Sequence, residues 1–287
     1  MRRGPRFTVD GLRAFGLKLK KREGRVKQGD GTSQAPWIVA HRGARREAPE
    51  NTGAAFDAAL AYPIDGIELD IQLSRDGIPV VFHDKTLTKA GAGRKRISDL
   101  TLRELHCLDW GSWFAKGFAH EPLLTLHETL QTYAGQTRLL IEIKSFEKER
   151  RRRVTDELTN QVLREISKRV PRRLRNRLFI LAFDMDVLAT AMDRGRRENL
   201  VLNLPADPRL DREGAALWRA LYGFCLPIGK LSRGFVTAAH ERGQKVMTYS
   251  CNRPYQLRKA LNFGVDTIMT DDPRWLFRYL KTPGVFV

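Results

Sequence analysis

Three acidic residues lie within two apolar runs, at spacings that would place their side chains together. The run Gly66–Leu73 contains Glu68 and Asp70, and the run Leu139–Lys144 contains Glu142. If these runs are strands, residues i and i+2 share a face, so Glu68 and Asp70 point to one side and their apolar neighbours to the other. Carboxylates buried side by side persist only if they are protonated, paired with a base or bound to a cation. The three groups therefore favour an all-oxygen site for one divalent cation, Mg²⁺ or Ca²⁺ rather than Zn²⁺.

A salt bridge is the simpler explanation for each of these carboxylates taken alone. Lys144 follows Glu142 by two residues and shares its face of the predicted strand. This lysine can balance the acidic charge or hold a phosphate oxygen. Separate salt bridges would require a coincidence at each acidic position, so we favour the cation site.

The tripeptide His41-Arg42-Gly43 directly follows the apolar run Trp37–Ala40. An imidazole exchanges protons near neutral pH, a guanidinium matches the geometry of a phosphate, and a glycine lets the backbone approach a ligand. The tripeptide therefore predicts a site that handles phosphate at the end of a strand. The alternative is that His41 is purely structural.

A second histidine, His83, precedes Asp84 and follows the short apolar run Pro79–Phe82. The dipeptide Asp76-Gly77 is typical of a hairpin turn, which would bring His83 back over the strand ends and close to His41. Two imidazoles beside one metal can act as general acid and general base. Alternatively, His83 only forms a hydrogen bond within its loop.

The segment Thr270–Pro273 contains two further acidic residues, Asp271 and Asp272. We expect Asp272 to be the N-cap of the last helix, with Pro273 in its first turn. A direct catalytic role for this segment is the alternative, and we favour the capping role. The remaining histidines lie in helical or inserted stretches and are expected to be structural or at the surface: His106, His120, His127 and His240.

These residues are positioned by a regular alternation of apolar runs and amphipathic segments. Strands are predicted at Trp37–Ala40, Gly66–Leu73, Leu139–Lys144, Leu178–Phe183, Leu200–Leu204, Gly223–Leu226, Lys245–Tyr249 and Thr267–Met269. Helices are predicted at Thr52–Ala61, Leu126–Tyr133, Arg151–Arg169, Val187–Arg194, Gly214–Leu221, Gly234–Arg242, Tyr255–Phe263 and Pro273–Leu280. Eight strands alternating with helices favour an α/β fold of the TIM (β/α)8 barrel type, whose chemistry takes place at the carboxyl ends of the strands. An open, doubly wound sheet is the alternative.

Two stretches do not fit the alternation. Residues 84–122, rich in glycine, arginine and tryptophan, predict a small inserted subdomain after the second strand that covers one end of the barrel. Residues 1–36 predict a basic extension that precedes the barrel domain, 37–287. The stretch 84–122 is called the insertion below.

The net charge of +18 is concentrated in two segments. Residues 1–36 hold ten Lys or Arg and three Asp or Glu, a net of +7, and residues 144–177 hold thirteen and five, a net of +8. Such blocks predict a polyanionic neighbour, for example an anionic membrane, unless they form a solvated face that only aids solubility. Nucleic acid is the poorer explanation, because aromatic residues do not interleave with the arginines.

The three cysteines show no CxxC spacing, which fits a reducing compartment. No run of about 18 apolar residues predicts a membrane span, and no apolar stretch after the basic N-terminus predicts a secretory signal. The expected location is therefore the cytoplasm, with peripheral membrane contact as an option.

Several stretches resemble the glycerophosphodiester phosphodiesterase family: AHRG (40–43), PENT (49–52), GIELDIQLSRDGIPVVFHD (66–84), IEIK (141–144) and GVDTIMTDDP (264–273). The resemblance implies a TIM barrel in which Glu68, Asp70 and Glu142 bind one divalent cation. It also implies that His41 and His83 are the acid–base pair and that Arg42 and Lys144 contact phosphate. The implied reaction is attack of the substrate's glycerol hydroxyl on phosphorus, followed by hydrolysis of a cyclic phosphate to an alcohol and glycerol 3-phosphate.

One departure concerns the seventh strand, where many family members carry a tryptophan and this chain has Thr248–Asn252. We expect Tyr249 to line the alcohol pocket instead. Two further hypotheses stay open: a phosphodiesterase that cleaves lysophospholipids at an anionic membrane, and a module that binds anionic lipid or nucleic acid without catalysis. An acid–base pair of histidines argues against the second, because a binding module needs none.

Overall fold

A computed structural model of the chain describes residues 35–145, 151–196, 198–208 and 218–281, without the side chains of 151–155. Its strands are β1 (Trp37–His41), β2 (Gly66–Leu73), β3 (Pro79–Val81), β4 (Arg138–Ile143), β5 (Leu178–Ala182), β6 (Leu200–Asn203), β7 (Gly223–Pro227), β8 (Lys245–Tyr249) and β9 (Thr267–Thr270). Its α-helices are α2 (Gly53–Leu60), α3 (Leu102–Leu105), α4 (Leu126–Tyr133), α5 (Arg151–Arg169), α6 (Met185–Asp193), α8 (Arg233–Glu241), α9 (Pro254–Phe263) and α10 (Pro273–Lys281). The 3-10 helices are η1 (Ile97–Asp99), η2 (Lys116–Phe118), η3 (Arg172–Arg177) and η4 (Ile228–Lys230).

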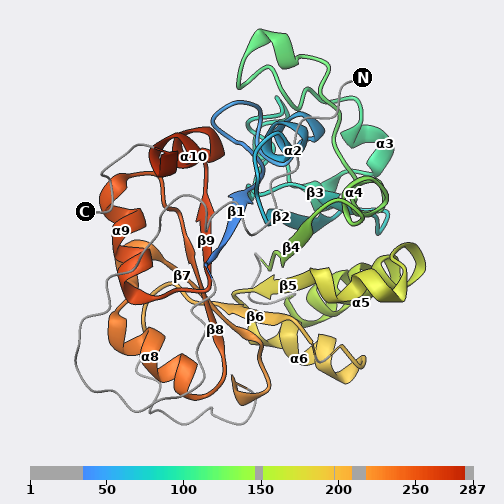
Figure 1. The fold of residues 1–287 in the computed structure, drawn as a ribbon. Coiled ribbons are helices and arrows are strands. Elements are labelled where there is room, and N and C mark those ends of the chain that lie inside the picture. Colours follow the sequence, from blue (N-terminus) through green and yellow to red (C-terminus); the bar gives the residue numbers. More distant parts are fainter. Residues whose placement is uncertain (1–34, 146–150, 197, 209–217, 282–287) are drawn as a thin grey trace, which may run out of the picture.

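The strands form a closed parallel barrel (Figure 1). The order β1-β2-β4-β5-β6-β7-β8-β9 returns to β1 through the parallel pairing of β9 with β1. β3 lies outside the ring and pairs antiparallel with β2, as the hairpin turn at Asp76-Gly77 predicts. The TIM barrel expected from the sequence is confirmed, and the open doubly wound sheet is excluded.

Apolar side chains on the two faces of the strands form separate cores. The outer core lies between the strands and the helices and includes Ile67, Leu69, Ile141 and Phe224, all fully buried. The inner core fills the barrel with Val39, Leu140, Phe179, Leu181, Val201, Cys225, Met247 and Met269. Because side chains alternate along a strand, the residue two positions after each inner-core residue again points into the barrel, one layer closer to the carboxyl end. That next layer is where polar side chains collect.

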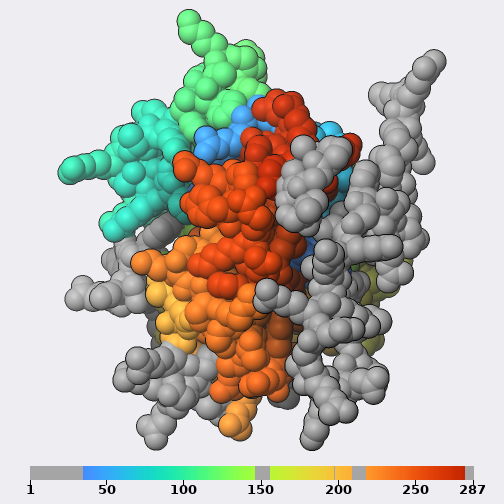
Figure 2. All heavy atoms as spheres, turned by 60° about the vertical axis from the view of Figure 1, so that its left-hand side comes forward, coloured from blue at the N-terminus to red at the C-terminus, as the bar shows by residue number. Residues whose placement is uncertain are grey.

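The insertion follows β3 and ends before α4, and it carries η1, α3 and η2. A third apolar cluster holds it against β3, including Val80, Leu87, Ile97, Leu105 and Trp110. The indole NH of Trp110 donates to the carbonyl oxygen of Leu105. The insertion, coloured teal to green, lies at the top of Figure 1 and projects from the upper left of the surface in Figure 2.

Local sequence explains most helix starts and stops. Thr125 and Ser232 are N-caps of α4 and α8, and their hydroxyl groups accept hydrogen bonds from backbone NH groups of the first turn. The carboxylate of Asp272 accepts from the backbone NH of Trp275, which fits its expected role as N-cap of α10. Gly264 ends α9 in the left-handed conformation that glycine adopts most readily.

Two predictions lie partly outside the described residues. The predicted helix Gly214–Leu221 is described only from residue 218, and almost all of the predicted N-terminal extension, residues 1–36, is not described. Within the described ranges, no helix is both long and apolar enough to span a bilayer.

Candidate active site

A layer of polar side chains lies at the carboxyl end of the barrel, directly above the inner core. His41 follows Val39 by two residues, and Glu142 follows Leu140 in the same way. The same step leads from Val201 to Asn203, from Met247 to Tyr249, and from Met269 to Asp271. The strand period therefore places one polar side chain from each of these strands at the mouth of the barrel.

Glu68, Asp70 and Glu142 converge in this layer. One carboxylate oxygen of each lies within 4.8 Å of the others, and all three residues are buried. The register explains this convergence, because Asp70 on β2 pairs directly with Glu142 on β4. Lys144 Nζ lies 2.8 Å from Asp70 Oδ1 and also contacts Glu142 Oε1, while Arg42 Nε lies 3.1 Å from Asp70 Oδ2.

Glu68, Asp70 and Glu142 are called the trio below. The basic residues around the trio compensate its three carboxylates to different degrees. Burial disfavours ionisation of Asp70, but Lys144 and Arg42 outweigh it and lower the pKa of this carboxyl. Burial raises the pKa of Glu68 well above its ordinary value, and the neighbouring Asp70 and Glu142 add to the effect. Glu142 also has a raised pKa, chiefly because it is buried. The site therefore holds more carboxylates than its own cations can keep ionised.

This arrangement fits a divalent cation. The donor set consists of carboxylate oxygens, which are the ligands of Mg²⁺ and Ca²⁺. A bound cation would relieve the repulsion that raises the pKa of Glu68. A further oxygen lies nearby, because Asn203 donates through Nδ2 to Glu142 Oε2 at 2.9 Å, while its buried Oδ1 has no hydrogen-bond partner among the residues that the structure describes.

His41 lies beside the trio and is oriented by Asp271. Its Nδ1 is 2.6 Å from Asp271 Oδ1, and its Nε2 is 3.9 Å from Glu68 Oε2. Burial lowers the pKa of His41, although the bond to Asp271 works against that shift. The imidazole is therefore neutral near pH 7, with the hydrogen on Nδ1 and a free lone pair on Nε2, because an ionised carboxylate can only accept.

The sequence did not predict the role of Asp271, because helix capping was favoured over a catalytic role for Thr270–Pro273. Its carboxylate is held by His41, by Asn252 Nδ2 at 2.6 Å and by Ser250 Oγ at 3.3 Å. These partners outweigh burial and lower its pKa, so it is ionised at neutral pH. The available signal was positional: in a closed eight-stranded barrel the last strand pairs with the first, so an acid at the end of β9 must lie near His41.

Two non-glycine residues with left-handed backbones, Arg42 and Asn51, frame the trio, with φ of 60° and 61°. Asn51 donates through Nδ2 to Asp70 Oδ2 at 2.9 Å, and its own backbone NH donates to the carbonyl oxygen of Arg42. Such conformations cost free energy and are concentrated at functional sites. Gly43 is required by packing, because a Cβ there would lie 2.7 Å from the backbone of Ala55. Asn51 lies in the PENT stretch (49–52) of the family resemblance, from which no role was assigned to it, whereas Asn203 carried no sequence signal, since amides are common at strand ends.

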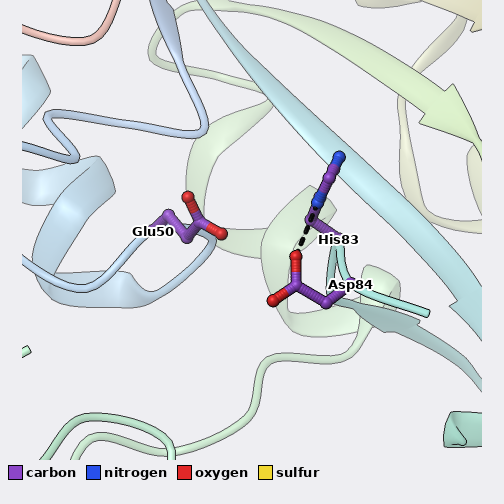
Figure 3. A group of neighbouring side chains, drawn as sticks. All are labelled: Glu50, His83 and Asp84. Carbon is purple, nitrogen blue, oxygen red and sulfur yellow. Dashed lines mark hydrogen bonds and ion pairs between the residues drawn. The ribbon is translucent and has the colours of Figure 1, made fainter. Parts of the chain in front are cut away.

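His83 follows the last residue of β3 by two positions. It lies near Asp70 and Glu142, since a positive charge on its imidazole lowers the pKa of both carboxyls. Its Nδ1 is 2.8 Å from Asp84 Oδ1, the contact drawn in Figure 3. In the same view Glu50, from the loop before α2, points toward this pair.

Glu50, His83 and Asp84 also bring potential ligand atoms within 4.8 Å, but basic side chains already pair with both acids. Lys89 Nζ lies 2.9 Å from Glu50 Oε1 and 2.9 Å from Asp84 Oδ2. Arg45 adds a contact of 2.7 Å to Glu50. This second cluster is therefore a compensated ion-pair network, whereas the trio retains an excess of carboxylates.

Tyr249 lies at the carboxyl end of β8, with its ring centroid 5.9 Å from that of His41. Burial raises the pKa of its hydroxyl group, so the side chain is uncharged. All the sequence-predicted site residues thus occur at one end of the barrel. Around them the structure adds Glu50, Asn51, Asn203, Ser250, Asn252 and Asp271.

Comparison with known proteins agrees with this geometry. Residues 41–274 match the glycerophosphoryl diester phosphodiesterase family. The chain belongs to this family. A glycerophosphodiester phosphodiesterase from Caldanaerobacter subterraneus is 30% identical over 254 residues, which cover 86% of this chain and 98% of that protein.

Solved structures of this family have the same fold. The first is an Oleispira antarctica phosphodiesterase in complex with the product sn-glycerol-3-phosphate, with a TM-score of 0.76 and 27% identity over 86% of this chain and 97% of that one. The second is a glycerophosphodiester phosphodiesterase from Agrobacterium tumefaciens, with a TM-score of 0.69 and 26% identity over 84% and 98% of the two chains. The family resemblance read from the HRG, ELD, HD and EIK motifs is confirmed.

Proposed function

We propose that this chain hydrolyses glycerophosphodiesters to an alcohol and sn-glycerol 3-phosphate, with one divalent cation held by Glu68, Asp70 and Glu142. The observation that carries the proposal is the convergence of three carboxylates within 4.8 Å of one another, with His41 3.9 Å from Glu68 and His83 near Asp70 and Glu142. A bound cation would supply charge stabilisation to the phosphoryl oxygens. Arg42 and Lys144 lie against the same carboxylates and would hold those oxygens in place.

His41 is the proposed general base. Its Nε2 would take the proton from the glycerol hydroxyl that attacks phosphorus, and Asp271 would stabilise the imidazolium that results. His83 would give a proton to the oxygen of the departing alcohol. Water then opens the cyclic phosphate with the two imidazoles in reversed roles, which returns both to their starting protonation states.

The direct test is turnover of glycerophosphocholine by the full chain, with release of glycerol 3-phosphate measured by a coupled assay. We expect activity that EDTA abolishes and that Mg²⁺ or Ca²⁺ restores. Turnover that persists after complete metal removal would contradict the cation site. Absence of turnover with every metal and diester would favour a binding module instead.

Peripheral contact with an anionic membrane is a second proposal, and it rests on the basic face formed by Arg172, Arg173, Arg175 and Arg177 of η3. In the described part of the chain none of these arginines forms an ion pair. Burial chiefly lowers the pKa of Arg177, and repulsion from the nearby positive charge of Arg138 adds to the effect. An anionic surface would relieve this repulsion.

The basic face lies at the amino ends of the strands, because η3 leads directly into β5 and Arg177 donates to carbonyl oxygens just before β4. The active site lies at the carboxyl ends. Docking through this face would leave the site open to soluble diesters. This placement favours soluble substrates over lysophospholipids, which would have to enter from the membrane side.

A further inference from the structure

The side-chain amide of Asn203 lies at the mouth of the barrel with one of its two ends in use. Asn203 is 2% exposed, and its side chain points into the barrel because it follows the inner-core residue Val201 by two positions. Its Nδ2 donates to Glu142 Oε2 at 2.9 Å. An ionised carboxylate can only accept, so this contact identifies the NH2 end of the amide and leaves Oδ1 as the free end.

Oδ1 of Asn203 is a buried acceptor without a hydrogen-bond donor in the described part of the chain. Two other buried atoms of the site also lack a hydrogen bond, but both lie in ion pairs: Arg42 Nε with Asp70, and Asp70 Oδ1 with Lys144. A buried acceptor without a donor costs free energy, which is why such atoms are rare in proteins and call for a partner. The donors that come to this site are the hydroxyl groups of the substrate and water molecules on the cation.

The position of Asn203 distinguishes between these hydroxyl groups. In the closed order of the strands β6 stands opposite β1, so Asn203 and His41 face one another across the mouth. In the proposed mechanism His41 takes the proton of the attacking hydroxyl, which is the C2 hydroxyl of glycerol because it neighbours the carbon that carries the phosphate. That hydroxyl cannot stay a donor to Asn203. The C1 hydroxyl of the same glycerol keeps its proton throughout and can donate to Oδ1.

We propose that Oδ1 of Asn203 accepts a hydrogen bond from the C1 hydroxyl of the glycerol portion, and that this contact selects diesters whose C1 position is free. The inference rests on the proposed function and adds a specificity-determining residue to it. A 1-acyl lysophospholipid carries an ester oxygen at C1, which cannot donate and would leave Oδ1 buried without a partner. A site that binds a substrate hydroxyl strongly rejects analogues that lack it, because its own buried polar group is then left unpaired.

The experiment compares kcat/KM for three diesters that differ only at C1 of the glycerol: glycerophosphocholine, its 1-deoxy analogue, and monomeric 1-hexanoyl lysophosphatidylcholine. All three keep the C2 hydroxyl and release choline, which is the common readout, so the head group and the chemical step cancel in the ratios. The variants are Asn203→Leu, which keeps the size without polar atoms, and Asn203→Ala. Asn262→Ala, at an exposed position of α9, is the matched control. Thermal unfolding identifies any variant that does not fold, and the two Asn203 variants are judged independently.

We expect the wild-type chain to prefer glycerophosphocholine over the other two diesters roughly 10- to 100-fold, the range for leaving a buried acceptor unpaired. In both Asn203 variants the ratio of kcat/KM for glycerophosphocholine to that for the 1-deoxy analogue should fall close to one. The preference over the lysophospholipid should fall with it. Asn262→Ala should keep the wild-type ratios. Any effect of the variants on Glu142 cancels, because the three diesters use the same cation.

Isothermal titration with Mg²⁺ and Ca²⁺ tests whether Oδ1 serves the cation or its water instead. In that case both Asn203 variants will weaken cation binding and yet keep the wild-type ratio between glycerophosphocholine and the 1-deoxy analogue, which overturns the proposal. A wild-type chain that cleaves these two diesters equally well also overturns it, while the proposed function stands. Absence of turnover with all three diesters would overturn both.

Discussion

Nδ1 of His41 lies 2.6 Å from Oδ1 of Asp271, although 230 positions separate the two residues. The contact joins β1 to β9, the pair that closes the barrel. The ionised carboxylate fixes the hydrogen of the imidazole on Nδ1 and leaves Nε2 facing Glu68. Closure of the barrel therefore sets the tautomer of the proposed general base.

Asp271→Asn should lower kcat roughly 10²- to 10⁴-fold, the range associated with general acid–base groups, because an amide can donate to Nδ1 and favour the wrong tautomer. KM should change little, since in the proposed mechanism Asp271 acts through His41 and not on the substrate. The measurement is steady-state kinetics with glycerophosphocholine. Asp272→Asn is the matched control: Asn and Asp are equivalent N-caps, so α10 and activity should both be preserved. Equal activity in the two variants would remove Asp271 from the mechanism.

Substitution of either proposed catalytic histidine should affect turnover without affecting metal binding. We expect His41→Ala and His83→Ala each to abolish detectable turnover yet retain affinity for Mg²⁺ or Ca²⁺, because neither imidazole is needed in the proposed ligand set. Isothermal titration with each metal checks this directly. His120→Ala, a change in an exposed residue of the insertion, is the control and should leave both properties unchanged. Metal affinity lost together with turnover would show that the assigned roles are wrong.

Glu68 predicts a dependence of stability on pH in the metal-free protein. Burial and its acidic neighbours raise its pKa in the folded state, so the folded state binds the proton more tightly than the unfolded state. The resulting stabilisation is complete below the unfolded pKa, about 4.3, and is lost as pH rises through the folded pKa. Each unit of difference corresponds to about 1.4 kcal/mol.

Glu68→Gln cannot ionise and should escape this loss. The measurement is the free energy of unfolding by urea titration in EDTA. The value for Glu68→Gln minus the value for the wild type should increase between pH 5 and pH 8. Added Mg²⁺ should stabilise the wild type and have a much smaller effect on the variant. Glu241→Gln, at an exposed position of α8, is the control. A difference between Glu68→Gln and wild type that stays constant with pH would contradict the raised pKa.

The fold and the centre of the site could be predicted from the sequence because both follow from the strand period. The alternation in Gly66–Leu73 placed Glu68 and Asp70 on one face, and the bounds of β2 and β8 agree with the prediction. The residues that support the site could not be found this way. Asn203, for example, lies at the end of the short strand β6. Its contact with Glu142 depends on the pairing of β4 with β5 and of β5 with β6, which the sequence of β6 alone does not show.

Asp271 was overlooked for a different reason: a local explanation for its segment was already sufficient. The pair Asp272-Pro273 is explained as the start of a helix, so no separate role was assigned to the neighbouring Asp271. Likewise, Glu50 and Lys89 are 39 positions apart and meet only because the insertion folds back over the loop before α2. Contacts of this kind depend on tertiary placement, which neither propensity nor periodicity encodes.

The basic face makes a prediction about membranes. Arg172→Gln with Arg173→Gln removes two exposed charges at the amino ends of the strands. Binding to vesicles that contain phosphatidylserine should weaken roughly 10- to 30-fold at physiological salt, since each juxtamembrane charge contributes about 1 kcal/mol. Turnover of soluble diesters should be unchanged, because the active site lies at the opposite end of the barrel. Cosedimentation with vesicles measures the first quantity, and the coupled assay measures the second.

The matched control for that experiment is Arg94→Gln with Arg103→Gln, which removes the same charge from exposed positions on the insertion. If net charge alone drives association, both double variants will weaken vesicle binding equally. If the basic face is the docking surface, only the first will do so. Unchanged vesicle binding after the Arg172 and Arg173 substitutions would exclude this face as the docking surface. Loss of turnover of soluble diesters in the same variant would show that the two ends of the barrel are not independent.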